Sequence, residues 1–255
     1  MVPRVTDTTT VLFEDRDLLV VNKPAGMVVI PARAEAPEAC LLHRLQAARA
    51  ERLWVVHRID RDTSGVVLFA RTAEAHRSLN AAFAGRAVHK QYLALARGSV
   101  PEPNLRHPIR IPLHTARKNK MRPAHPGEAD SLEAQTDLSL VARYDTSLGP
   151  LTLVHAMPVT GRQHQLRVHL RAIGCPLLVD PLYGHPGPIT GASLGIDPAI
   201  VLARTPLHAA TLTLTLDGAP PRTFTAPRPP DLRDLLDALD ASAPLGPTPA
   251  ATPSG

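Results

Sequence analysis

A charged ten-residue stretch runs directly into an apolar segment, and this boundary constrains the fold more than any other feature. Residues 66–70 have the composition of a buried strand, and the preceding stretch reads Val56-His57-Arg58-Ile59-Asp60-Arg61-Asp62-Thr63-Ser64-Gly65. The last three residues of the stretch supply a predicted turn. An isolated ion in apolar surroundings is costly, so Asp60 must be paired or protonated. We expect Arg58 to keep Asp60 ionised and nucleophilic. Alternatively, Asp60 is a turn residue in a structural salt bridge.

Further motifs lie before and after this stretch. They are Asn22-Lys23-Pro24-Ala25-Gly26, His89-Lys90-Gln91-Tyr92, Thr160-Gly161-Arg162-Gln163-His164-Gln165-Leu166-Arg167 and Asp180-Pro181-Leu182-Tyr183-Gly184. Together with the first stretch, they resemble the RluA/RluC/RluD family of pseudouridine synthases. The hallmarks of that family are N-K-P-x-G, H-R-L-D-x-x-T-S-G, K-x-Y and G-R-x-H-Q-L-R. The resemblance extends over residues 10–236.

The resemblance implies three catalytic residues. Asp60 would be the carboxylate that starts the reaction by attacking C1′ of the ribose, attacking C6 of the base or abstracting the C2′ proton. Tyr92 would pack on the target base, and its hydroxyl could move a proton from C5. Arg167 would pair with Asp60 through a bidentate guanidinium that aims the carboxylate. The alternatives are a core tyrosine and a solvated helix arginine.

The resemblance and the charge pattern also suggest substrate-binding residues. Leu166 would line an apolar floor for the uracil. Arg58 would fill the space left by an extruded uridine or hold the flanking phosphate. The basic run from His114 to Arg122 would follow the RNA backbone through Arg117, Lys118 and Lys120. Alternatively, this run is a solvated loop.

Composition agrees with an RNA partner. The net charge is +5, and the sequence pI is about 9.7, which suits a polyanion. We expect no metal and no cofactor, because the isomerisation of uridine changes no oxidation state. No signal peptide is evident, and no apolar run reaches the ~18 residues of a membrane span. We therefore expect a monomeric cytoplasmic protein acting on structured rRNA or tRNA.

Two rival functions remain. One is an RNA-binding protein without catalysis, which the intact set of Asp60, Tyr92 and Arg167 argues against. The other is a metal-dependent hydrolase using His57, Asp60, His164 and His169. However, an interval of five residues does not place His164 and His169 on one helical face, so we expect His169 to be a hydrogen-bonded core residue.

Periodicity indicates one α+β domain, a pseudouridine-synthase-like fold with a central mixed, mainly antiparallel sheet flanked by helices and loops. Expected strands cover 11–13, 18–21, 92–96, 138–141, 151–154 and 212–216, and expected helices cover 40–50, about 72–85, 162–173 and a last segment containing Leu232 to Leu239. We expect the catalytic domain at 10–240, a surface loop at 186–199 and a disordered tail at 241–255. The catalytic pattern starts by residue 11, so we expect the small N-terminal RNA-binding domain of larger relatives to be absent.

Overall fold

One ten-stranded sheet runs through the molecule and carries the remaining elements. The computed structural model describes residues 9–31, 40–117, 120–216 and 220–242. The main strand order is β1-β2-β4-β13-β5-β10-β9-β6, with β14 beside β13 and β3 beside β4. Its strands are β1 (Thr10–Glu14), β2 (Leu18–Lys23), β3 (Trp54–Val55), β4 (Ser64–Ala70), β5 (Val88–Arg97), β6 (Ile109–Arg110), β9 (Gln135–Thr146), β10 (Gly149–Pro158), β13 (Leu207–Leu214) and β14 (Arg222–Thr225).

Two short hairpins and six helices complete the described part. The hairpins pair β7 (Leu113–Thr115) with β8 (Met121–Pro123), and β11 (Ile189–Thr190) with β12 (Val201–Leu202). The helices are α1 (Leu41–Arg49), α2 (Ala73–Ala84), α3 (Glu102–Arg106), α4 (Gln165–Ala172), α5 (Gly191–Leu194) and α6 (Pro230–Ser242). In the main sheet only β4 and β13 pair in parallel. The predicted α+β fold with a mixed, mainly antiparallel sheet is confirmed.

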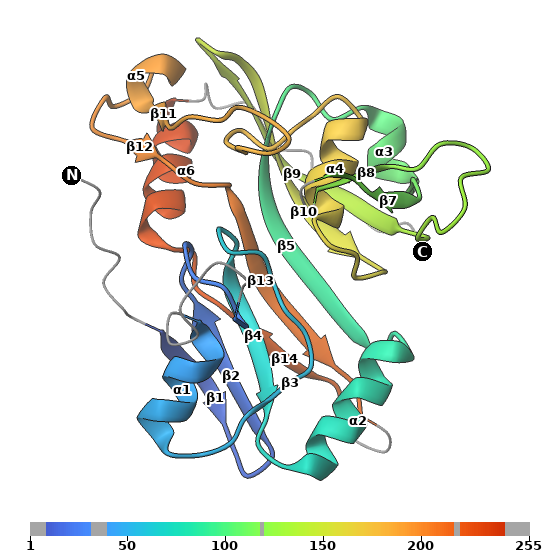
Figure 1. Ribbon diagram of the computed structural model, residues 1–255. Helices are drawn as coiled ribbons and strands as arrows, with labels where there is room; N and C mark the ends of the chain where they lie inside the picture. The colour runs from blue at the N-terminus through green and yellow to red at the C-terminus, as the bar shows by residue number, and fades with distance from the viewer. Residues whose placement is uncertain (1–8, 32–39, 118–119, 217–219, 243–255) are drawn as a thin grey trace, which may run out of the picture.

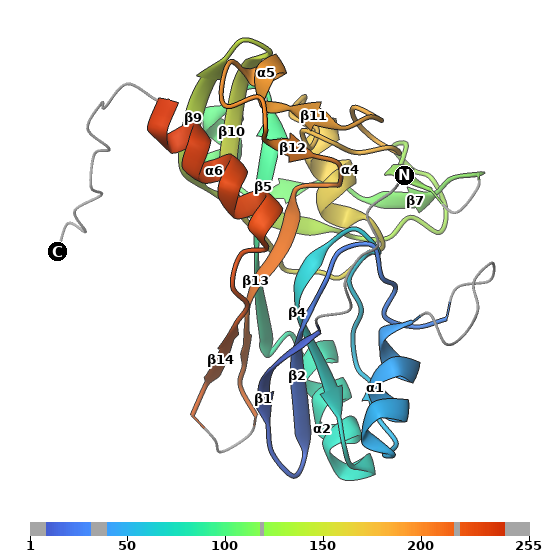
Figure 2. The same ribbon diagram turned by 90° about the vertical axis from the view of Figure 1, so that its left-hand side faces the viewer.

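The period-two alternation of the strands sends neighbouring side chains to opposite faces. In β4, Val66 and Leu68 pack in one apolar cluster with α2, whereas Val67 and Phe69 pack in another with α1. The same alternation in β5 directs two leucines to α6 and two alanines to α4. Figure 2 shows α6 and α4 on opposite sides of β5 and β10. Tyr92 touches both the α1 cluster and the α4 cluster.

Strands β5 and β13 join the two halves of the sheet, as Figure 1 shows. Where β4 starts against β13, the backbones come so close that only glycine fits. Gly65 has a φ of +116°, and a Cβ on it would lie 2.2 Å from the carbonyl oxygen of Ala209. This close approach fixes the start of β4, four residues after Asp60 in the charged stretch.

Most expected elements are present, with some differences in extent. Thr72 caps α2 through its side chain, 3.2 Å from the backbone N of Ala75, and Gly85 follows the last helical residue. The helix expected from residue 162 begins at Gln165. Ser64 already belongs to β4, so the turn is shorter than expected. The prediction of a surface loop at 186–199 was wrong, because Ile189 and Leu194 are buried and anchor β11 and α5 in the core.

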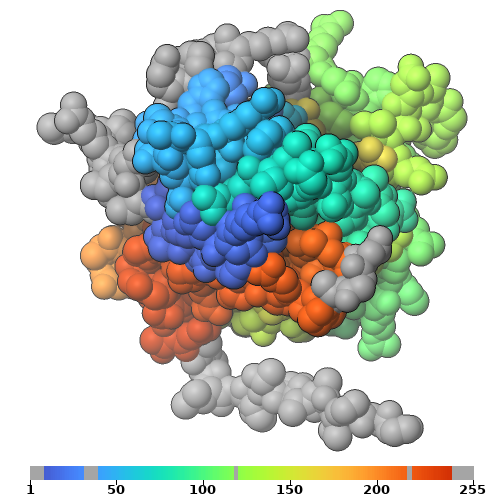
Figure 3. Space-filling view, turned by 90° about the horizontal axis from the view of Figure 1, so that it is seen from below, coloured from blue at the N-terminus to red at the C-terminus, as the bar shows by residue number. Residues whose placement is uncertain are grey.

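The first and the last strand of the sheet, β1 and β14, meet on one face. Seen from below, the blue β1–β2 region lies against the orange and red C-terminal elements (Figure 3). The Phe13 and Phe224 rings are 5.4 Å apart, and Arg222 pairs with Asp15 at 3.2 Å. The first two residues of the expected disordered tail, 241–255, belong to α6, and the rest of it lies outside the described residues.

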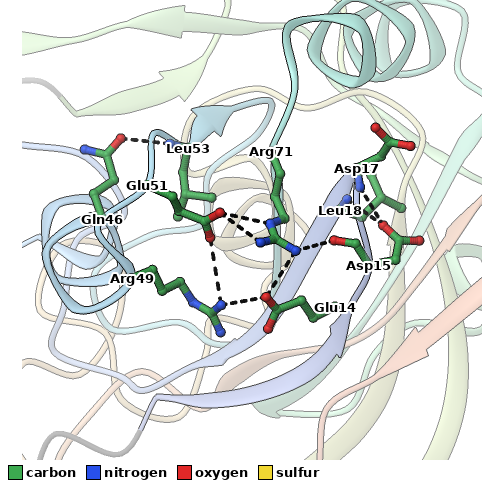
Figure 4. A network of polar contacts seen from close by, with 9 residues as sticks. All are labelled: Glu14, Asp15, Asp17, Leu18, Gln46, Arg49, Glu51, Leu53 and Arg71. Carbon is green, nitrogen blue, oxygen red and sulfur yellow. Dashed lines mark hydrogen bonds and ion pairs between the residues drawn. The ribbon is translucent and has the colours of Figure 1, made fainter.

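An ion-pair network ties the end of α1 to the ends of β1 and β4, as Figure 4 shows. Arg71 donates to Oε2 of Glu51 from Nε at 3.1 Å and from Nη2 at 2.9 Å, and its Nη1 lies 3.1 Å from Glu14. Arg49 reaches the same Glu14 oxygen at 2.7 Å. These side chains are about a quarter to a third exposed, so the network fixes geometry more than it adds stability.

Candidate active site

The loop between β3 and β4 carries Asp60, and backbone contacts hold it in place. The backbone N of Thr63 donates to the carbonyl of Asp60 at 3.2 Å, which closes the turn. The carbonyl of the next residue, Arg61, accepts hydrogen bonds from the backbone N of Gly26 and from the Lys23 ammonium, both at 2.9 Å. The loop that presents the carboxylate is therefore tied to the end of β2.

Lys23 is completely buried. Its Nζ donates to three carbonyl groups, those of Pro24, Met27 and Arg61, at 2.7 to 2.9 Å. Burial lowers the pKa of Lys23 to about 7, partly offset by the charge of Asp62. Its position assigns Lys23 to the support of the loop that bears Asp60.

Arg167, in α4, lies between two aspartates. Its Nη1 donates to Oδ2 of Asp60 at 3.1 Å, so the predicted contact is present. The predicted bidentate geometry, however, is found with Asp180, whose oxygens accept from Nε at 2.8 Å and Nη2 at 2.7 Å. Burial opposes the charge on Arg167, but the hydrogen bonds and charge of Asp180, with a smaller contribution from Asp60, keep its pKa above the usual value.

Asp180 is fully buried and accepts four hydrogen bonds. Besides the two from Arg167, the backbone N–H groups of Leu182 and Tyr183 donate to it at 2.9 and 3.1 Å. Burial alone would raise the pKa of Asp180, but these hydrogen bonds and the charge of Arg167 hold it below the usual value. A fully paired carboxylate of this kind fixes the guanidinium and leaves Nη1 for Asp60.

His164 and Tyr183 complete the surroundings of the carboxylate. Nε2 of His164 lies 4.0 Å from Oδ1 of Asp60, and its Nδ1 lies 2.8 Å from the Tyr183 hydroxyl. The same hydroxyl accepts a hydrogen bond from the backbone N of Met121 at 2.8 Å. The guanidinium of Arg167 lies over the Tyr183 ring, 5.1 Å from its centroid.

Two cavities meet at Asp60. One, of about 580 Å³, is bordered by Tyr92, Leu166, Lys90 and the ring of Phe83, and the other, of about 550 Å³, extends toward residues 28–31. Leu166 is buried, as a floor residue should be. The first cavity is large enough for a nucleotide base and its ribose.

Tyr92 lies on the wall of the first cavity, between the α1 and α4 clusters. Burial raises its pKa, and the charge of Asp60 raises it further. The phenol therefore keeps its proton at neutral pH, which suits a flat packing surface that can also donate a hydrogen bond.

Arg58 does not hold Asp60, so that prediction was wrong. It is exposed and borders both cavities, and Asp60 instead pairs with Arg167. An exposed arginine that borders both cavities remains compatible with a role in holding an extruded nucleotide.

The basic run lies on the β7–β8 hairpin rather than on an irregular loop. Arg117 is exposed and Lys120 is partly exposed, whereas Lys118 lies outside the described residues. Arg122 is not free for RNA, because its guanidinium pairs with both carboxylate oxygens of Glu128. That pairing lowers the pKa of Glu128 to about 2.

The four residues of the hydrolase alternative do not converge. Nε2 of His57 accepts a hydrogen bond from the backbone N of Leu68 at 3.0 Å. Both nitrogens of the buried His169 are engaged, with Thr136 and with the carbonyl of Ile111, each at 2.9 Å, as expected for a core histidine. Within the described ranges, no cluster of three or more metal-ligating side chains is found.

Sequence reasoning missed Asp180, Tyr183 and His164 as parts of the site. The first two were visible in the Asp180–Gly184 motif, but nothing in a linear pattern assigned them a partner. Gly184 is needed there because a Cβ would lie 2.9 Å from the carbonyl oxygen of Leu177.

The described residues contain no helix long and apolar enough to cross a bilayer.

Comparison with protein families gives a match over residues 17–172 to the model described as RNA pseudouridylate synthase. A similar curated protein is ribosomal large subunit pseudouridine synthase D of Nitrosomonas europaea, 35% identical over 90% of this chain. The chain spans 64% of that protein's length. The dual-specificity RNA pseudouridine synthase RluA of Yersinia pestis is 34% identical over 80% of this chain and 91% of its own.

A solved structure has the same fold. Human RNA pseudouridylate synthase domain containing 1 superposes with a TM-score of 0.69 at 27% identity, covering 95% of this chain and 98% of its own. Human RNA pseudouridylate synthase domain containing 4 gives a TM-score of 0.66 at 25% identity. The matched family segment ends with the last residue of α4, so it includes Asp60, Tyr92 and Arg167.

Proposed function

The chain belongs to the RNA pseudouridylate synthase family, and on that premise we propose that it isomerises uridines in structured RNA to pseudouridine. In this reaction the N1–C1′ bond breaks, the base turns and C5 bonds to C1′, after which the C5 proton leaves and N1 takes up a proton. Atoms and electrons balance without a redox partner. The chemistry therefore calls for a positioned carboxylate and an enclosed base, and for no cofactor.

The observation that carries the proposal is the oriented carboxylate at the junction of two cavities. Oδ2 of Asp60 is held by Arg167, and the side chain is 27% exposed, so Oδ1 is left for substrate. The rival without catalysis gives no reason to retain an oriented carboxylate beside a base-sized cavity.

Tyr92 and Leu166 are the proposed contacts for the uracil. The tyrosine ring would stack on the base, and Leu166 would form the apolar floor beneath it. Arg58 would occupy the space that the extruded uridine leaves, or hold its flanking phosphate. Unstacking the base costs a few kcal/mol, which such contacts would offset.

The proposed substrate is ribosomal or transfer RNA. Among the relatives, one is named for the large ribosomal subunit and another for dual specificity. Arg117, Lys118 and Lys120 would neutralise backbone phosphates, a contribution that is blind to sequence. A monomer is part of the proposal, because Asp60, Tyr92 and Arg167 come from a single chain. The proposal also places the protein in the cytoplasm.

The test is pseudouridine formation by the purified full chain and by Asp60→Asn. The amide keeps the shape of the carboxylate but lacks its charge, so RNA binding should persist while turnover falls by at least about 1,000-fold. Candidate rRNA and tRNA transcripts carrying tritium at C5 report turnover by tritium release, and chemical mapping identifies the uridine. Substantial turnover by Asp60→Asn would sink the assignment. A chelator should leave the wild-type rate unchanged, and a loss restored by added metal would favour the hydrolase.

A further inference from the structure

Oδ1 of Asp60 is the oxygen left for substrate, and one imidazole faces it. Arg167 holds Oδ2, whereas Nε2 of His164 lies 4.0 Å from Oδ1. At that distance the two atoms are not hydrogen-bonded, and the charge state of the imidazole decides how they interact. A neutral N–H would weakly orient the oxygen, but an imidazolium would bind it and compete with substrate.

The tautomer of His164 follows from the hydrogen bonds of Tyr183. The Tyr183 hydroxyl accepts from the backbone N of Met121, and its single proton then has one acceptor among the described residues, Nδ1 of His164 at 2.8 Å. If Nδ1 carried a proton instead, the buried hydroxyl would have no acceptor for its own. Nδ1 is therefore bare, and the proton of the neutral ring is on Nε2, facing Asp60.

The surroundings of His164 keep its ring neutral. Burial lowers its pKa, Asp60 and Asp180 oppose that effect, and Arg167 and Arg58 add to it. These charged groups come from the β3–β4 loop, from α4 and from the segment after it. Burial also raises the pKa of Tyr183, so its hydroxyl retains the proton that it donates.

We propose that Tyr183 and His164 are positioning residues for Asp60, with the Tyr183 hydroxyl keeping the imidazole neutral and its N–H directed at the free carboxylate oxygen. This inference rests on the proposed function of Asp60. Because Met121 belongs to β8, only these two side chains stand between the backbone of the basic hairpin and the carboxylate.

The backbone at His164 adds an independent observation. The residue caps α4 with a φ of +54°, a left-handed conformation that is uncommon outside glycine and in which His and Asn are enriched. The capping side chain makes no hydrogen bond to the helix. Instead, the strained conformation directs the ring between Tyr183 and Asp60.

Three single variants and one double variant of the full chain test the Tyr183–His164–Asp60 relay, in which the Tyr183 hydroxyl holds the His164 ring and the ring faces Asp60. Tyr183→Phe removes only the hydroxyl and keeps the ring under Arg167. His164→Asn suits the left-handed backbone and removes the group at Nε2. Tyr144→Phe is the matched control, because Tyr144 donates its hydroxyl to Asp240 at 2.7 Å, away from both cavities.

The direct measurement is the nitrogen NMR spectrum of the histidine rings without RNA, with the His164 signals identified by their loss in His164→Asn. We expect a protonated Nε2 and a bare Nδ1 in the wild type and in Tyr144→Phe. In Tyr183→Phe, signals of the charged ring should emerge at a higher pH than in the wild type. A wild-type Nδ1 that carries the proton, or a Tyr183→Phe spectrum unchanged at His164, would overturn the relay.

Single-turnover rates against pH give the second measurement. Tyr183→Phe should move the acid limb of the rate profile upward by about one pH unit, because a charged His164 would hold Oδ1. The shift should be missing in Tyr144→Phe and abolished in the Tyr183→Phe/His164→Asn double variant. An unshifted limb in Tyr183→Phe contradicts the relay. If the wild type modifies no RNA, the proposed function fails, while the NMR result still decides the tautomer.

Discussion

Arg167 donates a hydrogen bond to Asp60 across 3.1 Å, although the two residues are 107 positions apart in the chain. One nitrogen serves this bond, and the other two polar nitrogens are held by Asp180. The guanidinium is therefore shared between a buried acid that fixes it and a partly exposed acid that it orients. Because Asp180 fixes the guanidinium that orients Asp60, a substitution of Asp180 should affect the site as well as the fold.

Asp180→Asn should lower both stability and turnover. The amide leaves the buried Arg167 cation without its bidentate partner, so the free energy of unfolding should fall by about 3 to 5 kcal/mol. Arg167 can then shift toward Asp60, which should reduce the single-turnover rate. Urea unfolding and tritium release measure the two effects. Asp231→Asn, in the bidentate pair with Arg204, is the control that should lose stability but keep its rate; an equal loss of rate there would assign the effect to folding.

Acid should weaken the fold through Asp180. Its pKa is lowered in the folded protein, so the stability it contributes is present above the unfolded pKa of about 3.9. That stability is lost as pH falls through the lower, folded value. The difference in unfolding free energy between wild type and Asp180→Asn should shrink in that acid range and stay constant near neutrality. A difference that is independent of pH down to strong acid would contradict this account.

Tyr92→Phe should separate packing from proton transfer. The phenyl ring can still stack on the uracil, so the Kd for RNA should stay within about threefold of the wild type. Loss of the hydroxyl should slow the chemical step by about 100-fold if it moves the C5 proton. A larger kinetic effect of deuterium at C5 in the variant would locate the defect at that step. Tyr92→Leu, which lacks a flat ring, should weaken binding as well.

Salt dependence should report the basic hairpin. Arg117→Ala/Lys120→Ala should lower RNA affinity and flatten the plot of log K against log salt by about 0.7 to 0.9 per lost phosphate contact. The rate on fully bound RNA should barely change. Arg77→Ala/Arg233→Ala is the matched control, since both arginines are exposed on helices, in ion pairs with Glu74 and Asp234. An unaltered slope in the hairpin variant would mean that the RNA is held elsewhere, and the region of Arg58, Arg86 and Lys90 would be tested next.

Glu128→Gln should raise RNA affinity, the opposite of the effect expected for the hairpin variant. The substitution releases Arg122 from its ion pair and removes a negative charge from the hairpin, so RNA should bind more tightly at low salt. The same titration with Glu74→Gln, which frees an arginine on α2, should leave affinity unchanged. Weaker binding by Glu128→Gln would instead show that the ion pair is needed to shape the hairpin.

The sequence determined the elements and the identities of the central residues. The continuous apolar run from Val66 to Phe69 indicated a strand buried on both faces, and the stripe of leucines in α6 indicated a helix packed by one face, because both patterns are local properties of the chain. The motif pattern likewise named Asp60, Tyr92 and Arg167. Extents were less accurate where a short segment packs and pairs with residues distant along the chain, as at Ile189 and Leu194.

Only the tertiary structure decided how those residues share their partners. The sequence offered Arg58, two positions from Asp60, as its cation, but the loop directs Asp60 toward α4 while Arg58 faces solvent. Asp180 takes the bidentate bond because its Oδ1 is also fixed by two backbone N–H groups. A hydrogen bond forms only when packing brings its two atoms to within a few tenths of an ångström of the right separation. No pattern along the chain encodes those distances, which is why the contact between Arg167 and Asp60 was predictable from the motifs and the division of the guanidinium between Asp60 and Asp180 was not.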